Sequence, residues 1–335
     1  MDAIDFVLIW VDNTDPKWQK EKKRYSIKEK GYFDDRDVRY RDWNNIKYWF
    51  RGVEKYASWV NKVYFVTCGQ KPKWMNSDCP KLVLVDHKDF IPEEYLPTFN
   101  ANTIELNLHR IKNLSNRFVF FNDDMFIINS TKPEDFFINN SPRDLGILEP
   151  IFPTEKKGVA NIQTNNIEII NSYFKKNDVI NKNYRNWFNK KYGLKNIAKN
   201  LFLMPYDNIP GFYEPHIASN FLKSTYFEIW DKEYSILDQT CRHKFRNVKQ
   251  DVNQWLIRDW QLCKNAFIPR KANFGKYYDI DHNSDFNKII VEGKEKMICL
   301  NDIDDQVSEN GFNDMKNRCI KAFEKKFPEK SSFEI

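Results

Sequence analysis

Short apolar runs alternate with amphipathic segments through residues 1–140, and this alternation restricts the fold more than any other feature of the chain. The run Ile4–Val11 (IDFVLIWV) is β-branched and aromatic almost throughout, which is typical of a buried strand. Asp15 and Pro16 then provide an N-cap and a first helical residue, so the pattern predicts a helix over Lys17–Lys30.

The same alternation continues toward the middle of the chain. Further strands are predicted at Lys62–Thr67, Lys81–Asp86 and Arg117–Asn122. Apolar residues spaced three or four apart predict helices at Trp43–Tyr56 and Asn102–Leu114. Strands and helices that alternate in this way predict an α/β fold with a mostly parallel, Rossmann-like sheet and helices on both faces.

The second half of the chain has a different pattern. Asn139–Pro215 is rich in Asn, Lys and aromatic residues with few strand signals, which favours a helical insertion. Glu214–Phe267 is predicted to be helical, and Lys296–Asp302 is predicted to be a short strand that ends in an acid. We therefore expect three parts, which are residues 1–140, the helical insertion 141–212 and residues 213–335.

Charge and hydrophobicity limit the classes of function. The 335 residues contain 53 Lys and Arg against 47 Asp and Glu, a formal net charge of +6, and 41% are hydrophobic. A chain of this kind can bury a large core. Because no basic stripe dominates, nucleic acid is not expected as a partner, whereas an anionic small substrate is compatible with the charge.

Cysteine spacing and apolar run lengths bear on the compartment. The six cysteines include no CxxC pair, so we expect buried free thiols and a reducing compartment. The sequence shows no signal peptide and no run near the roughly 18–20 apolar residues of a membrane span. A soluble cytoplasmic protein is expected. The basic, partly amphipathic tail Lys316–Lys330 leaves peripheral membrane association open, and a solvated terminal helix is the alternative.

One acidic cluster interrupts the most apolar part of the chain. Asn122, Asp123 and Asp124 lie inside Phe118–Asn129 (FVFFNDDMFIIN), where carboxylates are expensive to desolvate. They follow a predicted strand, and ligands of parallel sheets bind beyond the carboxyl ends of the strands. Hard carboxylate oxygens there suit Mg²⁺ or Mn²⁺ bridging diphosphate oxygens. A polar junction between strand and turn is the alternative.

Other acids stand near predicted strand ends. Asn301 and Asp302 end the strand in ICLND, in the same way as the first cluster, and a capped turn is the alternative there. Asp12 follows the first strand, beside Trp10. Asp5 lies at the start of that strand, where a structural cap or ion pair is as well supported as a functional role.

Basic residues and one histidine could act on an anionic substrate. Arginines in Arg39–Trp43 (RYRDW) and at Arg51 could fork onto phosphate oxygens, although a solvated helix face is the alternative. His216 follows Pro215 at a predicted helix start, which favours anions, and it could relay a proton. Arg246 lies in the basic stretch RHKFR, a candidate phosphate contact.

Taken together, these motifs resemble the four conserved blocks of one family. The blocks correspond to Ile4–Trp18, Arg39–Ile127, Glu214–Ser224 with His243–Val252, and Met297–Asp305. The second block is long and specific. The chain is thereby similar to the Stealth proteins, bacterial capsular polysaccharide phosphotransferases related to the catalytic core of the animal lysosomal-enzyme N-acetylglucosamine-1-phosphotransferase.

The resemblance implies a reaction, a cofactor and a location. The expected fold is glycosyltransferase-A-like, with the nucleotide-sugar site in residues 1–140. The expected reaction transfers hexose-1-phosphate from a UDP-hexose or UDP-N-acetylhexosamine donor to a hydroxyl of a saccharide acceptor, a growing capsular or cell-surface polysaccharide. It forms a phosphodiester, releases UMP and needs Mg²⁺ or Mn²⁺. The expected place is the cytoplasm, and attachment to the inner face of the plasma membrane stays open. Because inserted elements often carry specificity, acceptor contacts are expected in 141–212, and a packing or oligomer surface is the alternative.

The resemblance also carries roles over to individual residues. The implied catalytic residues are Asp124, His216, Arg246 and Asp5. The implied substrate-binding residues are Trp10, Asp12, Arg41, Asp42, Arg51, Asn100 and Asn301. The implied metal ligands are Asp123, Asp124 and Asp302.

The sequence differs from the family pattern at two places, and two alternative functions remain open. Ala101 and Asn102 stand where the family often has Ser and His, and a common Glu near Asn45 is missing. A metal-dependent glycosyltransferase would use the same acids, but it would break the sugar C1–O bond and release UDP. A carbohydrate-binding module, using the 16% of aromatic residues to stack on sugars, is the non-enzymatic alternative.

Overall fold

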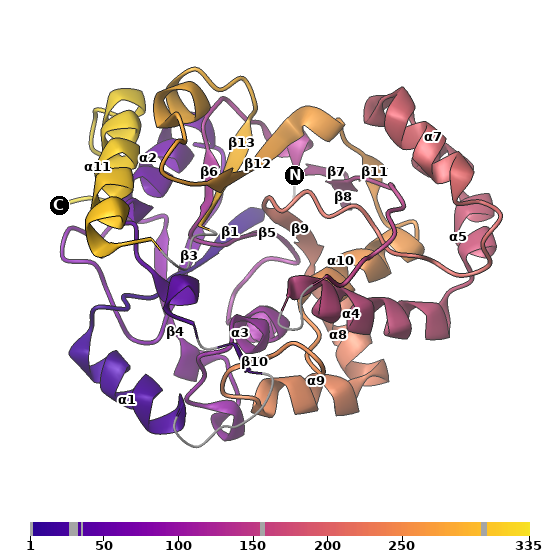
Figure 1. Cartoon of the computed structure of the whole chain (residues 1–335), viewed down its shortest axis with the longest axis horizontal. Coiled ribbons are helices and arrows are strands. Elements are labelled where there is room, and N and C mark those ends of the chain that lie inside the picture. Colours follow the sequence, from indigo (N-terminus) through magenta and orange to yellow (C-terminus); the bar gives the residue numbers. More distant parts are fainter. Residues whose placement is uncertain (1–2, 27–32, 35, 155–157, 303–306) are drawn as a thin grey trace.

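The computed structural model describes residues 3–26, 33–34, 36–154, 158–302 and 307–335 (Figure 1). A five-stranded sheet with the order β4–β3–β1–β5–β9 forms its centre. The strands are β1 (Ile4–Ile9), β3 (Val63–Thr67), β4 (Leu82–Asp86), β5 (Arg117–Phe121) and β9 (Ser219–Leu222). All neighbours pair in parallel except β5 and β9, which are antiparallel. The predicted mostly parallel sheet is confirmed.

Alternating side chains of β1 build a core on each face of this sheet. Phe6 and Leu8 point to one face, where they join a core with α2 (Ile46–Tyr56) and α11 (Glu309–Lys326). Val7 points to the other face and joins a second core with different helices. Those helices are α3 (Ala101–Asn107), α4 (Val159–Tyr173), α8 (Lys223–Lys232), α9 (Tyr234–Arg242) and α10 (Gln254–Cys263). The expected helices on both faces are therefore present.

A second, three-stranded sheet lies next to the first. Its order is β12 (Gly275–Ile280), β13 (Met297–Asp302) and β6 (Met125–Ile127). β13 is parallel to β12 and antiparallel to β6. Because β6 follows β5 directly after Asn122–Asp124, the chain leaves the central sheet and enters the second sheet at these polar residues.

The remaining elements are helices and short strands outside these two sheets. The predicted helical stretch contains α4, α5 (Lys176–Lys182), α6 (Tyr184–Trp187) and α7 (Leu194–Phe202) after β8 (Ser141–Asp144). The others are α1 (Pro16–Ser26), β2 (Phe33–Asp34), β7 (Phe137–Ile138), β10 (Arg246–Asn247) and β11 (Ile268–Pro269). β2 pairs with β10, and β8 pairs with both β7 and β11.

The prediction of helices around residues 214–230 and 238–260 is wrong in two places. Ser219–Leu222 forms β9, because pairing with β5 completes the sheet and Phe221 packs on Phe118 with ring centroids 5.7 Å apart. Between α9 and α10 the chain contains β10, whose hydrogen bonds go to β2. Long-range pairing of this kind is invisible to local periodicity.

Several predicted boundaries also differ from the structure. α2 begins at Ile46 rather than Trp43, and β1 ends at Ile9 rather than Val11. α3 ends at Asn107 and continues as a 3₁₀ turn to Arg110. The end of the predicted helix Lys17–Lys30 lies outside the described residues.

The cysteine and tail predictions can be compared with the structure directly. All six cysteines are free thiols, and all but Cys68 are buried. The tail helix α11 packs one face into the core through Met315, Cys319 and Phe323, so its apolar side is not available to a membrane. Among the described residues, no helix combines the length and apolarity needed to cross a bilayer.

Candidate active site

A cavity of about 260 Å³ opens where β1 and β5 end. Ile9 and Trp10 reach it from the end of β1, and Asn122 reaches it from the end of β5. This is the edge of a parallel sheet at which ligands bind. The predicted site residues that line it are Trp10, Arg41, Asp42, Asp123, Asp124, His216, Arg246, Asn301 and Asp302.

The two predicted acidic motifs are joined through the backbone. Asn122 and Met125 close a turn between β5 and β6, with the Met125 N–H bonded to the Asn122 carbonyl at 3.2 Å. The Leu300 N–H donates to the Asp124 carbonyl at 2.9 Å, which places the end of β13 beside this turn. The change of sheet at Asn122–Asp124 thus explains how carboxylates are accommodated within so apolar a run.

Burial and repulsion between carboxylates raise pKa values around the cavity. Burial, then the charges of Asp124 and Asp42, raise the pKa of Asp123 to about 8. Burial also raises the pKa of Asp42, and the nearby Asp12 adds to the effect. The pKa of Asp124 is raised by burial as well. Such a group of acids favours a bound cation, which would stabilise all of their charged forms.

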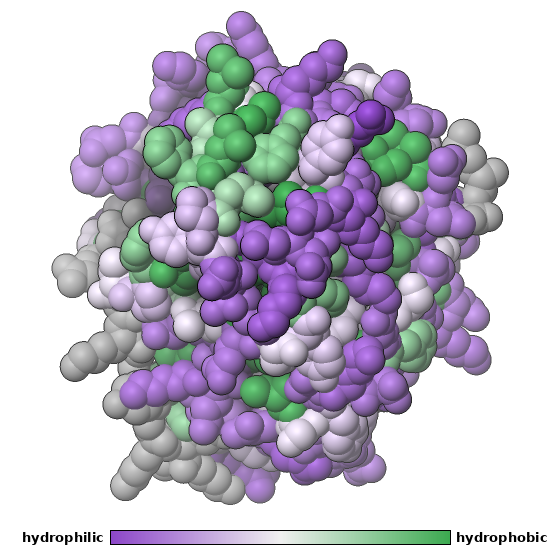
Figure 2. Space-filling view, turned by 90° about the vertical axis from the view of Figure 1, so that its right-hand side faces the viewer, coloured by the Kyte–Doolittle hydropathy of each residue, from purple (hydrophilic) through white to green (hydrophobic). Residues whose placement is uncertain are grey.

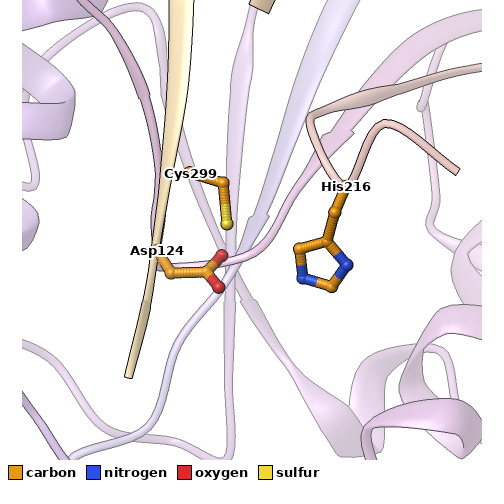
Figure 3. Close-up of side chains that lie close together, drawn as sticks. All are labelled: Asp124, His216 and Cys299. Atoms are coloured by element: carbon orange, nitrogen blue, oxygen red, sulfur yellow. The ribbon is translucent and has the colours of Figure 1, made fainter. Parts of the chain in front are cut away.

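His216 faces Asp124 and Cys299 across the cavity (Figure 3). Among the described residues, these three side chains form a group whose potential ligand atoms all lie within 4.8 Å of one another. The Oδ1 atom of Asp124 is buried without a hydrogen-bond partner among the described residues. Burial and the neighbouring Asp124 raise the pKa of the Cys299 thiol well above its usual range. Cys299 therefore stays protonated. The carboxylate of Asp124 lies close to the imidazole of His216.

The backbone at His216 is unusual. The prediction of a helix start there is wrong, because His216 lies in an irregular segment before β9, with φ of 46°. A left-handed residue other than glycine costs free energy and persists where its surroundings fix it. The rings of Trp255 and Tyr277 meet the imidazole edge to face, with centroids 5.8 and 5.1 Å away. The ring is thus held from two sides.

A buried ion-pair cluster anchors the segment that carries His216. Arg258 donates to Glu214 Oε2 at 2.8 Å and to Asp144 Oδ1 at 2.8 Å. Burial raises the pKa of Glu214 to about 7, against the opposing effect of Arg258. Removing one partner of such a buried pair would leave the other charge uncompensated. Arg258 therefore helps to fix the position of His216 without touching the cavity that His216 lines.

Two groups of cations border the cavity. Arg41 donates to Asp302 Oδ2 at 2.9 Å, and Trp43 Nε1 donates to the same oxygen at 3.3 Å. On another side, Arg246 belongs to β10, where it lies opposite Asp34 of β2. Arg39 bonds to Asp34 Oδ2 at 2.9 Å and also lines the cavity. The cavity therefore carries both carboxylates for a cation and guanidinium groups for an anion.

Four predicted site residues lie outside the lining of this cavity. Asp5 is at the opposite end of β1, where it accepts from Asn61 Nδ2 at 2.7 Å and from the Ser115 N–H at 2.8 Å. Arg51 binds both carboxylate oxygens of Glu334, at 2.8 and 2.7 Å. These contacts tie Asp5 to the start of strand β1 and Arg51 to the C-terminal segment.

Asn100 and Asp12 are the other two. Asn100 caps α3 and donates to Asp251 Oδ2 at 2.9 Å in a buried network that Asn102 also joins. Asp12 accepts from the Thr14 N–H at its own turn, and its charge contributes to the raised pKa of Asp42 in the cavity. The departure from the family pattern at Asn102 therefore lies in a buried network, whereas Ala101 lines the cavity.

Sequence reasoning missed several residues of the site. Cys299 lies within strand β13, and no sequence motif identifies it as a site residue. Trp255 and Tyr277 come from segments with no chemical signature, and they reach the site through α10 and β12. Glu105 has no motif around it either, yet it lines the cavity, and burial raises its pKa to about 7.

Sequence comparison identifies relatives along the entire chain. The model for Stealth protein CR1, conserved region 1, matches residues 2–30, and the model for Stealth protein CR2, conserved region 2, matches residues 39–144. The capsular polysaccharide phosphotransferase WcwK of Streptococcus pneumoniae is 48% identical, with 100% of this chain and 98% of the relative aligned. The receptor polysaccharide phosphotransferase WefC of Streptococcus oralis is 42% identical over 100% of both chains.

Two further matches are more distant from this chain in sequence. The exopolysaccharide phosphotransferase cps2G of Lactiplantibacillus plantarum is 38% identical, with 99% of this chain and 96% of the relative aligned. The solved apo structure of the bifunctional glycosyltransferase WbbM aligns with a TM-score of 0.42 at 10% identity, covering 96% of this chain and 51% of that chain. The full-length identities and the two matched regions show that the chain belongs to the Stealth family.

Proposed function

We propose that this chain transfers hexose-1-phosphate from a UDP-hexose or UDP-N-acetylhexosamine to a hydroxyl of a capsular or cell-surface polysaccharide. The product is a phosphodiester, and UMP leaves. The observation that carries the proposal is the meeting of carboxylates, guanidinium groups and the imidazole of His216 around a single cavity. The names of the full-length relatives, which are polysaccharide phosphotransferases, support the same reaction class.

The acids of the cavity fit a divalent metal. Asp123 and Asp302 offer hard carboxylate oxygens, and Asp124 has a buried oxygen with no hydrogen-bond partner among the described residues. This donor set suits Mg²⁺ or Mn²⁺. Cys299 would instead favour a softer ion, but burial keeps its thiol protonated. When bound, the metal would supply positive charge that neutralises the diphosphate.

The remaining groups suit phosphoryl transfer. Arg41 and Arg246 would bind oxygens of the diphosphate, where negative charge grows as UMP departs. His216 would take the proton of the acceptor hydroxyl, and the neighbouring Asp124 would stabilise the imidazolium that results. The acceptor oxygen then bonds to the β-phosphorus. The bond from that phosphorus to the bridging oxygen breaks, and its electron pair stays on UMP.

A second hollow beside the first cavity supports a route for the acceptor to His216. It has a volume of about 620 Å³, and it shares His216 and Trp255 with the first cavity. Tyr213 and Tyr277 also line it, so aromatic faces are available to stack on pyranose rings. We place the donor in the first cavity and the acceptor in this hollow, with His216 between them. Tyr213 belongs to the segment that immediately follows the predicted insertion.

Nucleotide analysis tests the proposal. The purified chain is incubated with a panel of UDP-sugars, Mg²⁺ and a saccharide acceptor, and the nucleotide products are separated by chromatography. We expect UMP to accumulate with one or a few donors, and Asp123→Ala to abolish its release. The formation of UDP without UMP would instead identify a glycosyltransferase. A complete lack of turnover, together with saccharide binding, would identify a carbohydrate-binding module.

A further inference from the structure

The amphipathic helix α7 has its apolar side turned outward. Leu194, Leu201 and Phe202 are exposed by 87%, 57% and 81%, although all three are large hydrophobic side chains. Within α7, all of which the structure describes, the buried residue is Asn200. A surface helix of a globular protein ordinarily points its apolar stripe at the core. The orientation of α7 is the reverse, so water contacts the side that would normally be covered.

Hydrogen bonds fix this orientation. Asn200 Oδ1 accepts from the Leu148 N–H at 2.7 Å, and Asn200 Nδ2 donates to the carbonyls of Gly146 and Trp187 at 2.8 and 2.6 Å. Because Asn200 is fully buried, rotation of the helix would leave these polar groups unpaired. Leu194, Ile197, Leu201 and Phe202 therefore remain on the outer side, and we call them the α7 apolar face.

Positive charge surrounds the α7 apolar face. Residues 173–208 contain eight basic residues and two acidic ones, so this segment has an excess of six positive charges. That excess equals the formal net charge of +6 of the whole chain, and the rest of the chain is balanced. The basic residues are Lys175, Lys176, Lys182, Arg185, Lys190, Lys191, Lys195 and Lys199. Lys176 is buried, whereas Lys190, Lys191 and Lys195 are exposed next to or within α7.

Exposed aromatic residues extend the same surface. Tyr184 and Tyr206, on either side of α7 in the sequence, are exposed. Figure 2 shows hydrophobic side chains gathered toward the top of this face, with hydrophilic ones around them. In Figure 1, α7 projects at the edge of the molecule. Tyrosine is typical of the interface between lipid and water, where its ring is buried and its hydroxyl stays wet.

We propose that the α7 apolar face and its surrounding lysines bind the surface of an anionic lipid bilayer. An amphipathic helix with apolar residues on one side and lysines beside them lies in the plane of such an interface. Anionic headgroups would attract the local positive charge. A second copy of the chain is a poorer partner, because pairing the same face of two copies would bring the exposed lysines of both copies, Lys190, Lys191 and Lys195, together. This inference does not depend on the proposed reaction.

Vesicle flotation with the full chain tests this inference. We expect the wild-type protein to float with vesicles rich in phosphatidylglycerol and not with pure phosphatidylcholine vesicles. Binding should weaken when NaCl is raised from low concentration to 0.5 M, because salt screens the lysines. Leu201→Glu and Phe202→Glu should each reduce partitioning about tenfold or more, since each removes an anchoring side chain and adds repulsion. Lys195→Gln should reduce it about fivefold.

Phe227→Glu is the matched control, because Phe227 is 57% exposed on α8, outside residues 173–208. It introduces the same charge and should leave flotation unchanged. Leu201, Phe202 and Lys195 are exposed, so the melting temperatures of their variants should match the wild type, and a melting curve of Phe227→Glu checks that losing the Phe227 contact with His109 leaves the control folded. Wild-type protein that fails to float, or variants that float as well as the wild type, would overturn the inference. So would a dimer in light scattering that Leu201→Glu dissociates, combined with no vesicle binding.

Discussion

Arg41 donates to Asp302 at 2.9 Å and so joins the segment before α2 to the end of β13, across 261 positions of sequence. Both residues line the cavity, and the pair is only partly exposed. In the free protein the guanidinium thus occupies an oxygen that we assign to the metal. A bound diphosphate would give Arg41 a different partner and release that oxygen.

The first prediction concerns this pair. We expect Arg41→Gln and Asp302→Asn each to lower kcat/KM by about a hundredfold, because each removes a charge that acts on the transferring group. Raising the Mg²⁺ concentration should partly restore Asp302→Asn and should have no effect on Arg41→Gln. Steady-state assays of UMP release over a range of Mg²⁺ concentrations would measure this. Equal rescue of both variants would show that Asp302 is not a metal ligand.

The second prediction concerns pH and stability. The pKa of Asp123 is raised from 3.8 to about 8 in the folded chain, chiefly by burial. Between these values the folded state holds a proton that the unfolded state releases, so Asp123 lowers stability as pH rises from about 4 to 8. Without metal, Asp123→Asn should therefore melt a few degrees above the wild type at pH 8.5 and lack activity. Thermal denaturation across pH, with chelator present, measures this effect.

Metal binding provides the complementary experiment. Mg²⁺ should raise the melting temperature of the wild type at pH 8, because it binds the folded state and favours the charged carboxylates. Asp123→Asn should remove most of that increase. Asp314→Asn is the matched control, since Asp314 is an exposed carboxylate on α11 outside the cavity. A control variant that lost the Mg²⁺ response would argue against the assigned site.

The third prediction separates Asp5 from the catalytic residues. Its carboxylate is fully buried, and it accepts from Asn61 Nδ2 and from the N–H groups of Lys62 and Ser115. Asp5→Ala would leave these donors unpaired and should destabilise the fold by about 2–4 kcal/mol. The kcat of the folded fraction should stay within about twofold of the wild type. Denaturant titration and active-fraction kinetics check both values, and a hundredfold loss of kcat in folded protein would restore Asp5 as a catalytic candidate.

The sheet and its acidic edge could be predicted from the sequence because both depend on local patterns. Asp123 and Asp124 come just after the apolar run Phe118–Phe121, so their place at a strand end follows from strand polarity alone, and the apolar run Ile4–Val11 marks the first strand in the same way. Asp5 belongs to the same run, but it lies at the wrong end of the strand for the cavity. The resemblance to the family assigned a catalytic role to Asp5, but it gave no information on which end of the strand faces the cavity.

Residues positioned by long-range packing could not be predicted in this way. A left-handed backbone conformation and contacts with Trp255 and Tyr277 fix the position of His216. Both aromatic residues are far from it in the sequence, so no local pattern predicts these contacts. The inverted orientation of α7 is a similar case. Its amphipathic pattern alone predicts burial of the apolar side, and only the contacts of Asn200 reverse that expectation.

The fourth prediction tests the acceptor hollow. Tyr213 lines the second hollow and is absent from the lining of the first cavity. Tyr213→Ala should raise KM for the acceptor about tenfold and leave KM for the donor unchanged, because stacking on a sugar ring is lost. Tyr234→Ala, at an exposed tyrosine on α9, is the control and should change neither constant. An equal rise in both KM values would place Tyr213 outside a dedicated acceptor site.

The fate of the β-phosphorus tests the central claim most directly. A UDP-sugar that supports turnover is prepared with radiolabel at its β-phosphorus and incubated with the chain, Mg²⁺ and acceptor. The account predicts that the label enters the saccharide product as a phosphodiester while unlabelled UMP is released. Label retained in UDP, with an unlabelled glycosylated product, would contradict it.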